Sequence, residues 1–125
     1  MENTDASISY NEKRLRLSLI GEDLLECSEI SRAEGLLAMQ KAAPQLKGGS
    51  RFLTFAVSYI IELFTERTEF ETAFELLENH VNNLPAEEQT EGRMVAAVLK
   101  KIFAGERPES IQETVSYYQT LYCPA

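Results

Sequence analysis

Phe52-Leu-Thr-Phe-Ala-Val-Ser-Tyr-Ile-Ile-Glu-Leu-Phe64 is the stretch around which we expect the fold to be built. Its three polar residues, Thr54, Ser58 and Glu62, recur every four positions and therefore share one narrow stripe of a helix. The rest of the circumference is apolar and needs cover from several neighbours. The run is too long for a typical strand, and it is too short for a bilayer, which needs roughly 20 apolar residues. We predict a buried central helix over residues 52–64.

Composition places the chain among ordinary globular proteins. It has 125 residues, 44% of them hydrophobic and 26% charged, which suits one domain with a core of its own. The net charge of -8 disfavours nucleic acid and anionic membrane surfaces as partners, because both would repel the chain. Residues 1–7 are polar and acidic, unlike a secretory signal, and no apolar run reaches spanning length. We expect a cytoplasmic protein without direct membrane insertion, in which Cys27 and Cys123 are both free thiols.

The breaks along the chain predict five to six helices. Residues 1–8 contain nothing that would bury them and are expected to fray, so the single helical domain spans residues 9–123. Ser9-Tyr-Asn-Glu12 has the form of a capping box and would open a first helix that runs to about Cys27. Arg14-Leu-Arg-Leu-Ser-Leu19 alternates as a strand does. We favour a helix there, because no other segment is a convincing strand partner.

Proline, glycine and a second capping box divide the rest of the chain. Pro44 ends one helix, Gly48-Gly49-Ser50 forms a loop, and Thr68-Glu-Phe-Glu71 caps another helix. The later helices are predicted over residues 29–43, 52–64, 68–81, 86–104 and 108–122. We predict an all-α single domain in which antiparallel hairpins surround the central helix, with Ile61 and Phe64 in its core.

Residues from Ser31 to Val81 resemble the cytoplasmic helical segment of MotA-type flagellar stator subunits. Ser31-Arg-Ala-Glu-Gly-Leu-Leu-Ala-Met39 is similar to that family's Arg-x-Glu-Gly-Leu-Leu-Ala-Leu-Glu helix, and Phe52-Leu53 and Val57-x-Tyr59-Ile-Ile follow at similar spacing. In the family this segment contacts the rotor through charged side chains, and the resemblance places Arg32 on the rotor-facing arginine.

The sequence also departs from the family pattern. The family's acidic partner falls on Gln40, and the glycine of its turn is replaced near Glu66-Arg67. The membrane helices that conduct ions are absent from this sequence. The resemblance therefore implies a helical module that binds another protein, and it does not imply ion-driven torque.

No motif indicates catalysis or a cofactor. His80 is the only histidine, and a lone histidine near a helix end is more often a packed or capping residue than a catalyst. Zinc sites need three or four converging ligands, which one histidine and two distant cysteines do not supply. Gly48-Gly49-Ser50 lacks the lysine that a phosphate-binding loop requires. We predict a non-enzymatic protein without metal or cofactor.

Acidic residues gather in the middle of the chain. Glu71, Glu75 and Glu78 recur at helical spacing, and no lysine occurs between Lys47 and Lys100. The simple interpretation is a solvated face that keeps the protein soluble. The alternative is a docking surface for a basic partner, on which the charges mainly steer association.

Tyr117 and Tyr118 form a second candidate surface. Neighbouring residues of a helix cannot both face one core, so we expect at least one of these rings to be exposed. Tyrosine is enriched at interface hot spots. One core ring and one ordinary surface ring is the simpler interpretation.

The sequence thus predicts an adaptor or other interaction module that binds a protein with a basic surface. The candidate partner-binding residues are Arg32, Glu71, Glu75, Glu78, Tyr117 and Tyr118. The family resemblance suggests a link to a motility or secretion-type assembly. The alternative is a small acidic chaperone or anti-adaptor that masks a basic or amphipathic client segment. The sequence is also compatible with a homo-oligomer.

Overall fold

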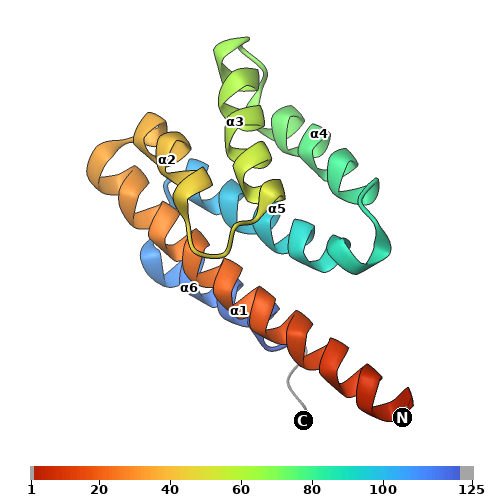
Figure 1. The fold of residues 1–125 in the computed structure, drawn as a ribbon. Helices are drawn as coiled ribbons and strands as arrows, with labels where there is room; N and C mark the ends of the chain where they lie inside the picture. Colours follow the sequence, from red (N-terminus) through yellow and green to blue (C-terminus); the bar gives the residue numbers. More distant parts are fainter. Residues whose placement is uncertain (1, 122–125) are drawn as a thin grey trace.

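The computed structural model describes the backbone of residues 2–121 and the side chains of residues 11–121. Over these residues the chain is all-helical and has no strand, as predicted (Figure 1). The elements in order are α1 (Glu2–Glu34), α2 (Leu36–Ala42), η1 (Ala43–Gln45), α3 (Arg51–Thr65), α4 (Phe70–Asn82), η2 (Ala86–Glu88), α5 (Gln89–Phe103) and α6 (Pro108–Gln119).

α1 is longer than predicted at both ends. The helix includes Arg14 to Leu19, so the strand alternative is wrong. It begins at Glu2, and the predicted capping box at Ser9 therefore does not open it. The predicted end near Cys27 is also wrong, because the helix continues to Glu34. The break comes at Gly35, whose φ of 98° lies outside the helical region and is readily reached only by glycine.

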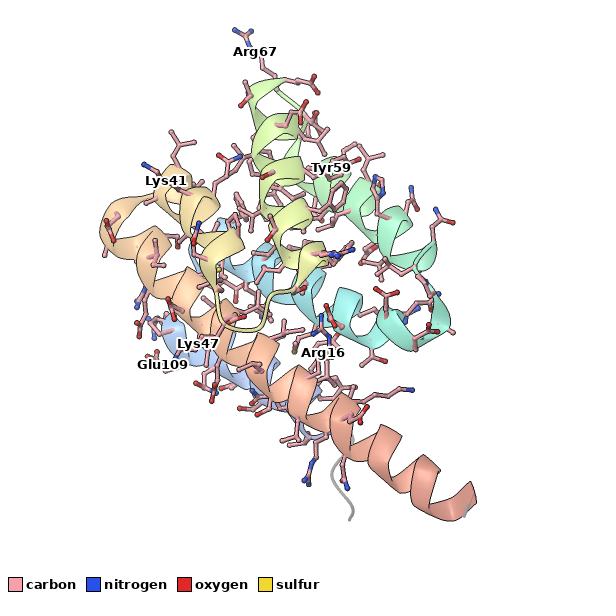
Figure 2. The ribbon with its side chains drawn as sticks, in the orientation of Figure 1. Arg16, Lys41, Lys47, Tyr59, Arg67 and Glu109 are labelled. Carbon is pink, nitrogen blue, oxygen red and sulfur yellow. The ribbon has the colours of Figure 1, made fainter. Side chains whose placement is uncertain are left out.

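The turn between α3 and α4 closes on a non-glycine residue. Arg67 has φ of 66°, its amide donates to the Phe64 carbonyl at 3.0 Å, and the Thr68 amide donates to the Leu63 carbonyl at 2.9 Å. This is a Schellman motif with arginine where glycine is usual, at a cost of about 1–2 kcal/mol. Figure 2 shows Arg67 at the tip of this turn. The predicted capping box at Thr68 is wrong, because Glu69 is the N-cap of α4 and its side chain makes no cap hydrogen bond.

Glycine and proline separate α5 from α6 as predicted. Gly105 has φ of 72°, and its amide donates to the Ile102 carbonyl at 3.0 Å. Pro108 is the first residue of α6. The predicted end of α6 near Tyr122 lies outside the described residues.

The most completely buried helix is α5, not the predicted central helix over residues 52–64. α5 packs against α1, α3, α4 and α6, and it buries six side chains and Gly92. α3 packs against α2, α4, α5 and η1 and buries only four side chains completely. They are Leu53, Ala56, Val57 and Ile60.

The prediction that Ile61 and Phe64 are buried is also wrong, since both are half-buried at the edge of the core. Aromatic residues on α3 shield one another in place of a covering helix. Phe55 is 39% exposed and stacks on Tyr59, with 5.2 Å between ring centroids. The apolar face of α3 around Phe55 therefore stays partly exposed.

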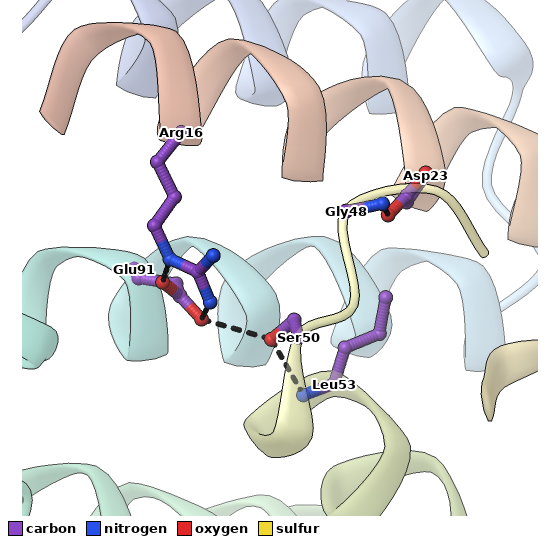
Figure 3. Close-up of polar contacts among 6 residues, drawn as sticks. All are labelled: Arg16, Asp23, Gly48, Ser50, Leu53 and Glu91. Carbon is purple, nitrogen blue, oxygen red and sulfur yellow. Dashed lines mark hydrogen bonds and ion pairs between the residues drawn. The ribbon is translucent and has the colours of Figure 1, made fainter. Parts of the chain in front are cut away.

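Polar contacts attach the loop before α3 to α1 and α5 (Figure 3). The Gly48 amide donates to the Asp23 carboxylate at 2.7 Å, and the Ser50 hydroxyl donates to Glu91 Oε2 at 2.8 Å. Ser50 Oγ also accepts from the Leu53 amide at 3.0 Å and so caps α3. Arg16 Nε donates to Glu91 Oε1 at 2.6 Å, which joins α1 to the same network.

Asp23 should make stability depend on pH. Burial raises the pKa of this carboxyl, and the Gly48 hydrogen bond only partly offsets the rise. Because the pKa is higher in the folded state than in the unfolded state, the protonated form of Asp23 favours folding. The stability that this form contributes is lost as pH rises through the folded-state pKa. Asp23→Asn keeps the acceptor for Gly48 without the buried charge. We expect the variant to unfold at a higher temperature than the parent at pH 7, because the parent then carries a buried charge that the variant lacks.

The measurement is thermal melting of both proteins from pH 4 to pH 8. The gap in stability should narrow as pH falls, because the parent's Asp23 then takes up a proton. Glu29→Gln is the matched control, because Glu29 is exposed on the same helix and its charge is not a cause of the raised Asp23 pKa. Parallel pH profiles for parent and Asp23→Asn would contradict the expectation.

Candidate functional site

A groove runs between α4, α5 and α6. Its volume is about 300 Å³, which is at the lower end of the range for ligand pockets. Apolar side chains of α4 and α5 lie beside charged and polar ones around it. The lining residues are Phe74, Glu78, Val81, Asn82, Arg93, Ala96, Ala97, Lys100 and Tyr118.

α4 supplies the acidic rim of the groove. Glu71, Glu75 and Glu78 are all exposed, as predicted, because Phe74 and Leu77 turn the other face of the helix into the core. We call these three glutamates the acidic rim. Only Glu78 lines the groove itself.

α5 supplies cations that partly neutralise this rim. Lys100 Nζ lies 2.9 Å from Glu71 Oε1. The hydrogen bond to Glu71 is the main cause of a raised pKa for Lys100, and Glu78 and Glu75 add to the rise through their charges. The pair is well exposed and contributes at most about 1 kcal/mol. α4 has no lysine of its own, and Lys100 of α5 neutralises Glu71 instead.

Arg93 is the second cation on the α5 wall. Its Nη2 donates to Gln89 Oε1 at 3.4 Å, one turn back along α5. Arg93, Ala97 and Lys100 recur at helical spacing on the face that borders the groove. The spacing of these two cations and one small residue is a local property of the sequence. This surface was not predicted, because the prediction for residues 86–104 rested on the apolar side of that helix.

α6 places Tyr118 at the same groove. Tyr118 is half-buried in the lining, and burial is the main cause of a raised pKa for its hydroxyl. Tyr117 is 62% exposed, and its ring centroid lies 5.1 Å from that of Tyr118. The expectation that at least one of the two rings is exposed is confirmed by Tyr117. One residue from each of the two surfaces that the sequence suggested, Glu78 and Tyr118, therefore lines the same groove.

Arg32 stands apart from this groove. It is exposed in the last turn of α1. Gln40, at the position of the stator family's acidic residue, donates to Ser58 Oγ at 3.2 Å and so joins α2 to α3. The structure thus does not bring Arg32 together with the other candidate residues.

His80 takes part in an exposed aromatic cluster with Phe55 and Tyr59. Its ring centroid lies 5.0 Å from that of Phe55 and 4.8 Å from that of Tyr59, edge-on to both. Figure 2 shows Tyr59 between α3 and α4. Phe55 and His80 also border a shallow hollow of about 280 Å³ with Arg51, Phe52, Leu84 and Glu88. These contacts agree with a packed histidine.

Cys27 is a free and fully buried thiol, and burial raises its pKa to about 12. Cys123 lies outside the described residues, so the prediction of two free thiols is confirmed for Cys27 only. Among the side chains of residues 11–121, no three His, Cys, Asp or Glu come together as metal ligands would. Over the same range, the helices include none with the length and apolar character needed to cross a membrane.

No family model, curated protein or solved structure gives a match to this chain. The resemblance of residues 31–81 to stator subunits therefore stays a prediction. Function has to be inferred from the groove and its rim.

Proposed function

We propose that the chain is a non-enzymatic interaction module that binds a basic, amphipathic segment of another protein along the groove between α4, α5 and α6. One observation carries the proposal: the exposed glutamates of α4, of which Glu78 lines the groove, lie beside apolar side chains and a tyrosine of α6. Such a rim suits the charges of a basic segment, and the groove suits its apolar side chains.

The two parts of this surface contribute in different ways. Exposed carboxylates mainly raise the rate of association and set its dependence on salt. Affinity comes from the apolar area that is removed from water, at about 25 cal/mol per Å², less the cost of ordering both partners. The half-buried Ala97 and Tyr118 can provide such area, whereas Phe74, Val81 and Ala96 are already buried within the fold. Glu71 is engaged by Lys100, so Glu75 and Glu78 are the carboxylates available to a partner.

A designed peptide tests the proposal without knowledge of the natural partner. An amphipathic helical peptide of leucine and lysine should bind the full chain, and its leucine–glutamate counterpart should not. Glu75→Lys with Glu78→Lys should weaken binding of the basic peptide at least about tenfold at low salt. Binding by the parent should also weaken as salt rises. Titration calorimetry measures each affinity.

The control keeps the change in net charge and moves it to another helix. Glu109 and Glu113 are exposed on α6 and do not line the groove. Glu109→Lys with Glu113→Lys should bind the basic peptide nearly as the parent does. Equal losses in both double variants would show that only overall charge matters and would overturn the groove as the binding site.

A chaperone or anti-adaptor is the second candidate. It is favoured by large apolar side chains that are exposed away from the groove, such as Leu15 at 63% and Leu37 at 71%. A chaperone would keep an otherwise insoluble amphipathic client in a one-to-one soluble complex, whereas an adaptor would bind a partner that is soluble alone. The proposed cytoplasmic location and the link to a motility or secretion-type assembly rest on composition and on the resemblance of residues 31–81.

A further inference from the structure

We propose that the segment bound along the groove between α4, α5 and α6 is bipolar. It carries lysine or arginine on the edge that faces α4, and a carboxylate on the edge that faces Arg93 of α5. The inference rests on the proposed function, because it names the chemistry of the partner at the same groove. It adds the requirement for an acidic group in a segment that is otherwise basic.

Arg93 brings an available positive charge to the α5 wall of the groove. Within the described residues it forms no ion pair, and its one hydrogen bond runs from Nη2 to Gln89 Oε1 of the same helix at 3.4 Å. A guanidinium has five N–H donors in a planar fork, so most of them are left for a partner. The other cation of this wall, Lys100, is already engaged by Glu71 at 2.9 Å.

Glu78 brings an available negative charge to the α4 wall. The ion pairs among residues 11–121 do not include it, so it is not neutralised by Arg93. Both charges act on the hydroxyl of Tyr118. Burial is the main cause of the raised pKa of Tyr118, the charge of Arg93 lowers this pKa, and the charge of Glu78 raises it. The groove therefore presents one available charge of each sign, on different walls and within reach of the same side chain.

A segment with basic residues on both edges does not match these two walls. On the α4 edge, its cations would meet Glu78 and the exposed Glu75. On the α5 edge, its cations would meet Arg93, which repels them and also loses water as the segment covers it. A carboxylate on that edge instead accepts hydrogen bonds from the guanidinium, and this pairing is commonly bidentate. The charges of the lining therefore select a segment with one edge of each sign.

Two helical peptides test the inference with the full chain. Both carry a stripe of leucines. The first has lysine on both edges of the stripe, and the second has lysine on one edge and glutamate on the other. The parent should bind the second peptide about fivefold more tightly at low salt, and this difference should shrink as salt rises. Titration calorimetry measures both affinities.

Substitution of Arg93 tests whether this residue sets the preference. Arg93→Glu should reverse it, because both lysine edges of the first peptide then meet carboxylates. Arg93→Gln should abolish the preference without reversing it. Arg93 is exposed, so both variants should fold normally, which thermal melting checks. Arg107→Glu is the matched control, because Arg107 is exposed and does not line the groove.

The control makes the same change in net charge as Arg93→Glu and should keep the parent's preference. A reversal in Arg107→Glu as well would show that only overall charge matters and would overturn the inference. Equal affinity of the parent for the two peptides would also overturn it, as would a preference that Arg93→Glu leaves unchanged. These three outcomes leave the binding of a basic segment in place, whereas a parent that binds neither peptide would overturn the proposed function as well.

Discussion

Replacing Leu99 by alanine should lower the free energy of unfolding by about 2–5 kcal/mol. Leu99 is fully buried on α5, the helix that packs against α1, α3, α4 and α6. The substitution removes apolar contacts and leaves a cavity that four helices cannot easily collapse to fill. Because small domains are stable by only about 5–15 kcal/mol, the loss is a large part of the total. Thermal or urea unfolding measures it.

Leu37→Ala is the matched control, because the same atoms are removed from a side chain that is 71% exposed. Its effect should stay within about 0.5 kcal/mol. Phe64→Ala should be less destabilising than Leu99→Ala, since the Phe64 ring is half-buried and packs against Phe70 and Phe103. If Phe64→Ala destabilised the protein more than Leu99→Ala, α5 would not be the centre of the core.

Gly21→Leu should separate α1 from α6 and destabilise the protein by about 1–3 kcal/mol. A Cβ on Gly21 would lie 2.5 Å from Gln119 Nε2 and 2.8 Å from Val115 Cγ1. Val115 is fully buried, so it has no free space into which to move. Gln119 Nε2 donates to the Ser18 carbonyl at 3.0 Å, and this contact between α1 and α6 would also be lost.

Leucine is a better helix former than glycine by about 1 kcal/mol, and this difference offsets part of the destabilisation of Gly21→Leu. Glu22→Leu, at the exposed neighbour on α1, is the control and should change stability by no more than about 0.5 kcal/mol. Chemical denaturation of both variants measures the difference. A stabilised Gly21→Leu variant would mean that α6 does not lie against α1 at this glycine.

The candidate site was partly predictable. The exposure of Glu71, Glu75 and Glu78 follows from their spacing relative to Phe74 and Leu77, which is a local property of one helix. Glu78 and Tyr118 line the same groove because of the way α4, α5 and α6 pack. Periodicity along the sequence does not reveal this packing. The pairing of Glu71 with Lys100 joins residues far apart in the chain, so local patterns could not predict it.

By itself, the sequence determined that the chain is helical, because helical periodicity, Gly105 and Pro108 act within one or two turns of backbone. Packing decided which helix is central. A run that is apolar nearly all round, such as residues 52–64, has no single side to bury, and the structure leaves part of it at the surface. α5 concentrates its apolar residues and Gly92 toward its neighbours and is covered by four helices. Burial depends on how many elements surround a helix, and contacts between distant segments set that number.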